Sequence, residues 1–195
     1  MKNRFHSLSI LLLVVLVSIL IMIVPTFFTK GISRVSLNKE ITLALVLNDE
    51  KDIKIVFFGY SGCSDICTPR LKSLAEFYES LDDTTKRRVG VEFLDISVPH
   101  DRTLPSRFAE FFHKEFKGIY LSQKSLREYT RAFSIYFAQS LSDKTEYDHT
   151  TNIYLIKKRD KIKEIRYVYN SYPYDLKQIN IDIKELLNES NTNSQ

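Results

Sequence analysis

Two cysteines separated by three residues are the most reactive feature of this 195-residue sequence. Cys63 and Cys67 are the sequence's two cysteines, and their spacing lets the sulfur atoms share one metal ion or form one disulfide. They precede a segment with helical periodicity, so we expect them in a loop at a helix N-terminus. Backbone N–H groups and the helix dipole there favour the thiolate, which is the form that binds metal and attacks disulfides. The pair therefore predicts a metal site or a redox-active dithiol.

A third ligand for such a site would come from a histidine. His6 precedes an apolar N-terminal segment and is out of reach, and His113 lies on a predicted helix, where a structural or exposed role is the usual one. His100 falls in a polar loop, where a structural or exposed role is again the usual one. His149 differs because it stands at the entry of a predicted buried strand, and α/β sheets gather such strand ends near the loop that follows the first strand.

Two thiolates and one imidazole suit copper. Soft thiolates hold Cu(I), and an added nitrogen ligand lets the same site keep Cu(II). Thioether ligands are excluded because the two methionines, Met1 and Met22, both precede the domain. Structural zinc is a weak alternative because it requires four protein ligands. Copper, as Cu(I) or Cu(II), is the cofactor that Cys63, Cys67 and His149 predict.

Three other roles for the cysteine pair stay open. It could cycle between dithiol and disulfide as an extracytoplasmic oxidoreductase that reduces partner cysteines. It could also be a plain structural disulfide, although so small a ring stabilises little through loop entropy. A peroxidase is the weakest reading, because no arginine and threonine pair accompanies the cysteines. An ordinary thioredoxin is disfavoured by the three-residue spacing and by the absence of a proline just before residues 152–156.

The elements around the cysteines follow the order of an α/β domain. Ile53–Phe58 is a nearly continuous apolar run, typical of a central strand that is covered on both faces. After the cysteine loop, Thr68 is the expected N-cap of a helix with Pro69 at its first position. This order predicts a thioredoxin-like fold with a central mixed sheet flanked by helices. The other expected elements are strands at 40–47 and 89–98, helices at 105–117, 122–133 and 174–187, and a β-hairpin of strands at 147–156 and 162–169.

The N-terminal segment Leu8–Phe28 has no charged residue. Its 21 positions would reach roughly 30 Å as a helix, which matches the hydrocarbon core of a bilayer. A cleaved signal peptide is the alternative, but the run is long and no small-x-small cleavage site follows it. We therefore expect a single-pass inner-membrane protein whose domain faces the periplasm or another extracytoplasmic space. The expected layout is a cytoplasmic N-terminus at 1–7, a transmembrane anchor at 8–28, a tether at 29–39, the domain at 40–187 and a disordered tail at 188–195.

Charge argues against binding to nucleic acid. The net charge of +4 arises entirely in the first 34 residues, which contain four basic and no acidic residues. The rest of the chain is electrically balanced, whereas a protein that binds nucleic acid through phosphates needs a basic surplus. The expected partners are the membrane and another copper or thiol protein.

Two motifs resemble those of one family. Phe58–Cys67 resembles the GYTxCPDICP-like motif of the SCO/SenC family, whose members are membrane-anchored, thioredoxin-like copper proteins that help to assemble cytochrome c oxidase. Cys63 and Cys67 take the places of its two copper thiolates, and Asp65 that of its aspartate. The run from Asp148 is similar to the family's DHS-type run, whose histidine is the third copper ligand, so His149 inherits that role. The similarity extends over roughly residues 40–187.

The resemblance implies a function and a partner. It implies a membrane-anchored metallochaperone, rather than an enzyme, that delivers or holds copper for the copper centre of cytochrome c oxidase, with an oxidase subunit as partner. Residues 93–103 are similar to the family's V-D-P-x-x-D-T stretch, with Asp101 matching the second aspartate. The chain departs from the family at three positions: Ser64 and Thr68 replace prolines, and Ser97 falls where the first aspartate is expected.

Overall fold

The computed structural model describes residues 12–20, 33–42, 51–141, 143, 146–159 and 162–192. The chain divides into two compact units, Met1–Ser33 and Arg34–Gln195. In the first unit residues 12–20 are helical and their apolar side chains are exposed. None of the helices in the described ranges combines the length and the apolar character needed to cross a membrane. The remainder of the anchor expected at 8–28 lies outside the described residues.

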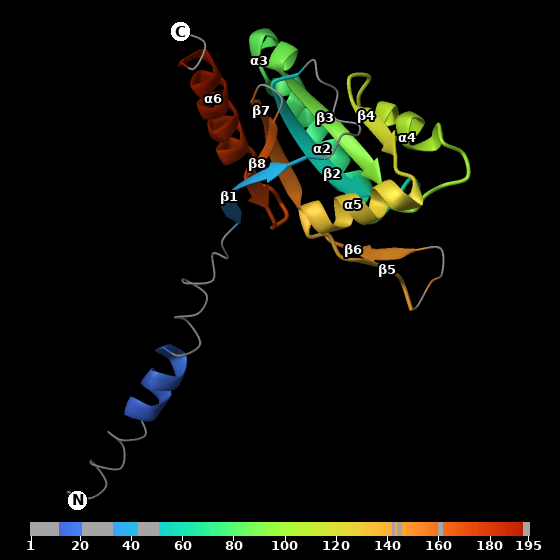
Figure 1. Cartoon of the computed structure of the whole chain (residues 1–195). Helices are drawn as coiled ribbons and strands as arrows, with labels where there is room; N and C mark the ends of the chain where they lie inside the picture. The colour runs from blue at the N-terminus through green and yellow to red at the C-terminus, as the bar shows by residue number, and fades with distance from the viewer. Residues whose placement is uncertain are drawn as a thin grey trace, which may run out of the picture. The chain divides into compact units, whose positions relative to one another are not determined.

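A six-stranded mixed sheet forms the centre of the second unit (Figure 1). The strand order is β1-β8-β7-β2-β3-β4. The three strands β2, β3 and β4 run parallel, whereas β7, β8 and β1 join by antiparallel pairing. The predicted central mixed sheet is therefore confirmed. The strands are β1 (Arg34–Ile41), β2 (Ile53–Gly59), β3 (Val89–Asp95), β4 (Lys117–Tyr120), β7 (Ile153–Arg159) and β8 (Ile162–Tyr169).

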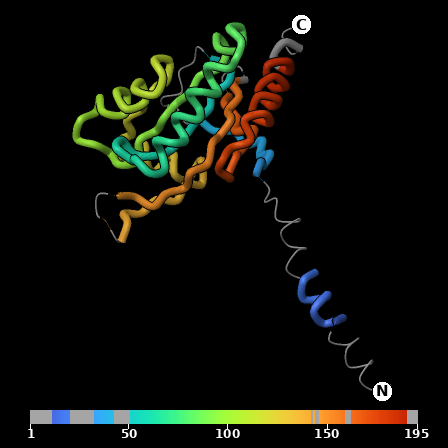
Figure 2. Tube along the Cα trace, turned by 180° about the vertical axis from the view of Figure 1, so that it is seen from behind, coloured from blue at the N-terminus to red at the C-terminus, as the bar shows by residue number. Residues whose placement is uncertain are grey.

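Helices cover both faces of this sheet. One face carries α5, and the opposite face carries α2 and α6 (Figures 1 and 2). Every residue of β2 is buried, as its apolar run predicts. Phe58 packs on Phe133 of α5 at 5.0 Å between ring centroids, while Phe93 of β3 packs on Phe108 of α4 at 5.2 Å. The helices are α2 (Cys67–Ser80), α3 (Asp83–Arg88), α4 (Leu104–Phe112), α5 (Gln123–Phe133) and α6 (Leu176–Thr192).

A small second sheet consists of β5 (Phe137–Gln139) and β6 (Tyr147–His149). The strand predicted at 147–156 is therefore two strands, β6 and β7, with a break at 150–152. Thr150 explains the break, because its N–H donates to the carbonyl of Tyr136 and its hydroxyl accepts from the N–H of Tyr136. These bonds tie the end of β6 to β5 instead of extending β7. The predicted hairpin of the following strands is confirmed as β7 and β8.

The first strand begins earlier than expected. Most of the strand predicted at 40–47 lies outside the described residues, and β1 instead occupies positions 34–39 that we assigned to the tether. Arg34 explains this, because its guanidinium makes two bonds, at 2.6 and 2.8 Å, to the buried carboxylate of Asp182 in α6. The compact unit accordingly starts at Arg34 and not at residue 40.

Several helix boundaries also differ from the prediction. The helix predicted at 105–117 ends at Phe112, and β4 begins at Lys117. Gly118 lets β4 pass close to the start of α4, since a Cβ there would lie 1.7 Å from the carbonyl oxygen of Pro105. The helix α6 continues to Thr192, so residues 188–192 are helical where we expected a disordered tail. The prediction of Ser122 as the N-cap of α5 is correct, because its hydroxyl accepts from the N–H of Ser125.

Candidate metal centre

Strand pairing brings the cysteine loop and His149 together. The loop follows the end of β2, and β7 runs antiparallel to β2 with Ile153 opposite Phe57. The residues that precede β7 therefore lie at the same end of the sheet as the loop. Sulfur atoms of Cys63 and Cys67 and a ring nitrogen of His149 lie within 4.8 Å of one another. Within the described part of the chain, these residues form the one group of three potential metal ligands.

The ligand atoms already face one another. The N–H of Cys67 donates to Sγ of Cys63 at 3.1 Å, and Sγ of Cys67 lies 3.6 Å from Nε2 of His149. Nδ1 of His149 lies 3.0 Å from the carbonyl oxygen of Thr150. A carbonyl accepts only, so Nδ1 carries the proton and the lone pair of the neutral ring is on Nε2, on the side of the cysteines. Both cysteines are free and buried, and His149 is half-buried.

The start of α2 differs in detail from the prediction. Cys67 is the first residue of the helix, Ile66 occupies the N-cap position, and Thr68 lies within the first turn. Thr68 therefore does not cap the helix, and its hydroxyl instead donates to the carbonyl of Cys63 at 2.8 Å. This bond closes the loop across both cysteines. It supplies part of the restraint that a proline at this position would give.

The two sulfur atoms differ in acidity. The pKa of Cys63 falls to about 4, mainly because the Cys67 side chain donates a hydrogen bond to it, with further donation from backbone N–H groups. The pKa of Cys67 rises, because its proton is held by Cys63 and because it is buried. The reduced pair thus has one thiolate and one thiol near neutral pH. A bound soft cation displaces the remaining proton.

This difference predicts how stability depends on pH. An unfolded cysteine has a pKa of about 8.5. The folded pKa of about 4 for Cys63 therefore stabilises the fold by its full amount above pH 8.5, and this stabilisation is lost as the pH falls toward 4. In reduced, metal-free protein the free energy of unfolding should therefore rise from pH 5 to pH 8 relative to Cys63→Ser. The slope is bounded by about 1.4 kcal/mol per pH unit. Urea unfolding of both proteins measures it, and a constant difference would contradict the assignment.

Gly59, the last residue of β2, makes room for the sulfur of Cys67. A Cβ at this position would lie 2.6 Å from Sγ of Cys67 and 3.0 Å from the ring of Phe93. Both neighbours are buried, so neither can move away easily. Glycine is therefore required by the packing of the cysteine itself.

We expect Gly59→Ala to damage the centre. The added methyl group should lower the free energy of unfolding by about 1–3 kcal/mol and displace the Cys67 sulfur. Copper affinity should fall by at least roughly tenfold, measured by competition with a Cu(I) chelator. Gly90→Ala is the matched control, because the methyl there would lie no closer than 3.3 Å to its neighbours, the side chains of Lys51 and Lys54. Equal losses in both variants would show that the effect is not specific to the cysteine.

A buried carboxylate that we did not predict supports the cysteine loop. Asp95 ends β3 opposite Gly59, and its side chain is fully buried. One oxygen accepts from the N–H (2.9 Å) and hydroxyl (2.5 Å) of Ser61, and the other from the N–H (2.8 Å) and hydroxyl (2.6 Å) of Ser97. The family resemblance places its first aspartate at Ser97. The carboxylate that bonds to the cysteine loop in this structure is that of Asp95, two residues earlier.

Tyr60 links the loop to the hairpin that carries His149. Its hydroxyl donates to the carboxylate of Glu146. Its ring contacts Tyr147 at 5.3 Å between centroids and meets His149 edge-on at 5.9 Å. The sequence does not reveal this role of Tyr60, because it depends on a separate two-stranded sheet that packs against the loop.

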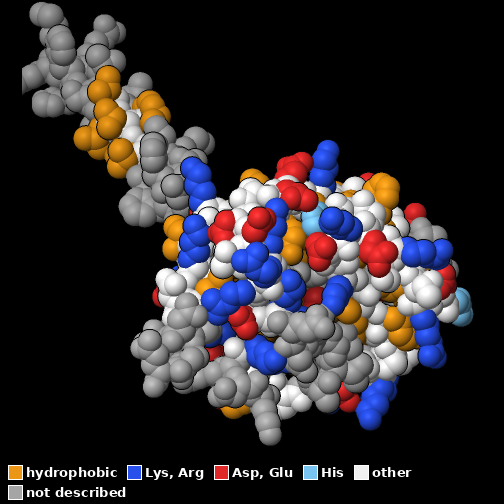
Figure 3. Space-filling model, turned by 90° about the horizontal axis from the view of Figure 1, so that it is seen from above, with side chains coloured by type: hydrophobic (Ala, Val, Ile, Leu, Met, Phe, Trp, Pro, Cys, Tyr) orange, Lys and Arg blue, Asp and Glu red, His pale blue; other side chains and the backbone are white. Residues whose placement is uncertain are grey.

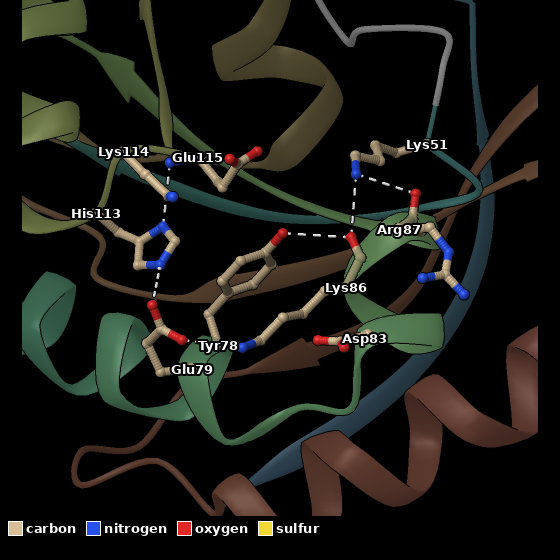
Figure 4. Close-up of a pocket in the computed structure, with 9 residues that line it drawn as sticks. All are labelled: Lys51, Tyr78, Glu79, Asp83, Lys86, Arg87, His113, Lys114 and Glu115. Carbon is tan, nitrogen blue, oxygen red and sulfur yellow. Dashed lines mark hydrogen bonds and ion pairs between the residues drawn. The ribbon is translucent and has the colours of Figure 1, made fainter.

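The other histidines lie elsewhere. His113 is the C-cap residue that follows α4; its Nε2 lies 2.8 Å from Glu79, and its Nδ1 accepts from the N–H of Glu115. This histidine lines a polar pocket whose groups bond to one another: Lys86 pairs with Glu79, and Lys51 donates to the carbonyls at the end of α3 (Figure 4). The prediction of a structural role for His113 fits these contacts. His100 is exposed, and His6 lies outside the described residues.

Asp65 and Asp101, which match aspartates of the family motifs, do not lie among the three candidate metal ligands. Asp65 is exposed and accepts a hydrogen bond from Ser64. Asp101 accepts from the N–H and hydroxyl of Thr103 and pairs with Arg107, so it stabilises the approach to α4. Over the face drawn in Figure 3, basic and acidic side chains are interspersed. This mixture agrees with the balanced charge of the domain sequence.

Comparisons with known proteins identify relatives. The SCO1/SenC family model matches residues 50–187. An SCO2-like protein of Rickettsia conorii is 24% identical over 136 residues, covering 65% of each chain, so this chain spans just under two thirds of that relative's length. Apo Sco1 of Thermus thermophilus is 25% identical with a TM-score of 0.59, covering 70% of this chain and 80% of its own. Copper-bound ScoI of Arabidopsis thaliana is 19% identical with a TM-score of 0.60, covering 72% and 86%. The predicted thioredoxin-like fold is confirmed by these structures.

Proposed function

The chain belongs to the SCO1/SenC family, and from this we propose that it holds one copper ion at Cys63, Cys67 and His149 and delivers it to the copper centre of cytochrome c oxidase. The observation that carries the proposal is the convergence of two sulfur atoms and one imidazole nitrogen within 4.8 Å. The Sco family is one of cytochrome c oxidase assembly proteins, and structures with this fold hold copper. The fold is not the sole support for this proposal, because this chain itself brings together two cysteine sulfur atoms and one histidine nitrogen.

Each ligand has a distinct task. Cys63, already a thiolate near neutral pH, offers the first sulfur ligand, and Cys67 releases its proton to become the second. Two thiolates hold Cu(I), and the Nε2 lone pair of His149 adds the nitrogen that Cu(II) prefers. The carbonyl of Thr150 keeps the ring in the required tautomer. Three protein ligands leave a coordination position for a ligand from the recipient, so the ion can be handed over by exchange.

We also propose that the N-terminal segment anchors the protein in a membrane. The uncharged segment 8–28 would tether the domain to the outer face of the inner membrane, with residues 1–7 on the cytoplasmic side and the domain in the periplasm or another extracytoplasmic space. The length and apolar character of the segment support this arrangement. Because β1 begins at Arg34, the proposed tether shortens to residues 29–33.

Copper transfer tests the function. The full chain in mild detergent, loaded anaerobically with one equivalent of Cu(I), is mixed with a purified copper-free fragment of the oxidase subunit that carries the copper centre. We expect the fragment to gain copper from the protein faster than from an equimolar copper chelate. Copper that stays on the protein, or moves no faster than from the chelate, would contradict delivery.

A thiol-disulfide oxidoreductase is the second candidate. The low pKa of Cys63 and the nearby thiol of Cys67 favour it, because they provide an attacking thiolate and a resolving thiol. Insulin reduction measured on the same samples separates the two functions. Reductase activity without retained copper would favour this candidate, and retained copper with no reductase activity would exclude it.

A further inference from the structure

A groove lies beside the metal centre. Its volume is about 430 Å3, and its walls come from the loop after β3, from α5 and from the β5–β6 hairpin. Its apolar lining includes Ile96 and Leu126, which are buried, and Val98 and Phe137, which are half-buried. Side chains from three separate segments thus form one hollow with an apolar floor.

The groove is coupled to the metal ligands by two short series of contacts. Tyr147 lines the groove and packs on Tyr60, which in turn meets His149. Ser97 also lines the groove and bonds to Asp95, which bonds to Ser61 in the cysteine loop. Through the first series an occupant of the groove would lie two side chains from His149, and through the second it would reach the cysteine loop at Ser61.

Two arginines on the groove wall have no hydrogen-bond or ion-pair partner among the residues that the structure describes. Arg127 and Arg131 are exposed and one helical turn apart on α5, where like charges repel each other. Across the residues that the structure describes, neither makes a hydrogen bond or an ion pair. Arg88, Arg107 and Arg166, by contrast, each pair with a carboxylate. Two neighbouring guanidinium groups above an apolar floor are complementary to carboxylates that flank an apolar side chain.

Val98 adds a second local feature. Its φ of 50° is in the left-handed region, which a β-branched residue rarely adopts. Such residues concentrate at sites that clamp a ligand. This one lines the groove.

We propose that the groove binds an acidic segment of the partner protein, with carboxylates on Arg127 and Arg131 and an apolar side chain between Val98 and Leu126. This inference rests on the proposed function, since it identifies how the copper partner docks next to His149. Two arginines that have no partner among the described residues, together with the contacts that lead to His149, favour a partner segment over a second copy of the chain or a free anion.

Peptide binding to the copper-loaded full chain tests the docking. The probe is acetyl-Glu-Asp-Leu-Phe-Glu-amide, and its charge-inverted form has Lys at the acidic positions. We expect the acidic peptide to bind at millimolar concentration and Arg127→Glu/Arg131→Glu to weaken it at least roughly tenfold. The control Lys124→Glu/Lys184→Glu changes net charge equally at exposed residues that do not line the groove, and it should bind as the wild type does.

Other results would overturn the docking. These are no binding of the acidic peptide, equal binding of both peptides, equal losses in the two charge variants, or full competition by acetate at the same carboxylate concentration. A dimer of the wild type that Arg127→Glu/Arg131→Glu abolishes would assign the groove to a second copy instead. A copper titration accompanies each sample. Failure of the wild type to bind copper would contradict the proposed function, whereas normal copper binding without peptide binding would contradict the docking alone.

Discussion

Cys63→Ser and Cys67→Ser should each abolish tight Cu(I) binding. Each change leaves one thiolate and one imidazole, and a hydroxyl is a poor ligand for a soft monovalent cation. We expect the Cu(I) affinity to fall by at least roughly a thousandfold, which corresponds to about 4 kcal/mol of binding free energy. An anaerobic competition titration with a Cu(I) chelator measures the change in the full chain. Both variants should lose affinity to a similar degree, because the proposed centre uses both sulfur atoms as ligands.

A neighbouring residue supplies the control for the cysteine variants. Ser64 lies between the cysteines in sequence, is exposed, and bonds only to Asp65 among the contacts of its side chain that the structure describes. Ser64→Ala should therefore keep the Cu(I) affinity within about tenfold of the wild type. If Cys67→Ser kept that affinity as well, the second sulfur would not be a ligand and the account of the centre would be wrong.

His149→Ala should separate the two oxidation states of copper. The two thiolates remain and continue to hold Cu(I), whereas Cu(II) loses its nitrogen ligand. We expect Cu(II) affinity to fall by at least roughly a hundredfold, with a smaller loss for Cu(I). The reduction potential of the bound copper should therefore rise. Thiolate-to-copper absorption and the electron paramagnetic resonance spectrum of the Cu(II) form report the change.

Another histidine provides the matched comparison. His113 pairs with Glu79 and does not join the metal ligands, so His113→Ala should leave the copper spectra unchanged. A His149→Ala protein with the spectrum and Cu(II) affinity of the wild type would contradict the role of the imidazole. Equal losses of Cu(I) and Cu(II) would indicate that the substitution disturbs the hairpin rather than removing a ligand.

The central part of the fold could be predicted because it depends on local patterns. The apolar run at Ile53–Phe58 forms the fully buried β2, and the alternation at 162–169 gives the bounds of β8. Ser122 caps α5 as its sequence position indicates. These features arise from burial and from bonds between residues close in sequence, which a single chain displays directly.

The errors arise where distant residues decide local structure. β1 starts at Arg34 because that side chain reaches Asp182, 148 residues later. The strand expected at 147–156 breaks because Thr150 pairs with Tyr136 of the preceding segment. Neither partner can be identified from the periodicity of the strand itself.

The same limit applies to the site. The proximity of Cys63, Cys67 and His149 could be predicted because their residue types and their positions at strand ends are visible in the sequence. Asp95 could have been found from its place at the end of the parallel strand beside β2, where its carboxylate meets the cysteine loop. Tyr60 offers no such signal, since its contact with the hairpin depends on how β5 and β6 pack.

X-ray absorption spectroscopy of the copper-loaded protein tests the central claim most directly, because it counts the sulfur and nitrogen neighbours of the metal. In the Cu(II) form we predict two sulfur neighbours and one imidazole nitrogen from the protein. In His149→Ala the sulfur count should remain two and the imidazole signal should disappear. A copper ion without sulfur neighbours, or an imidazole signal that persists in His149→Ala, would contradict a centre formed by Cys63, Cys67 and His149.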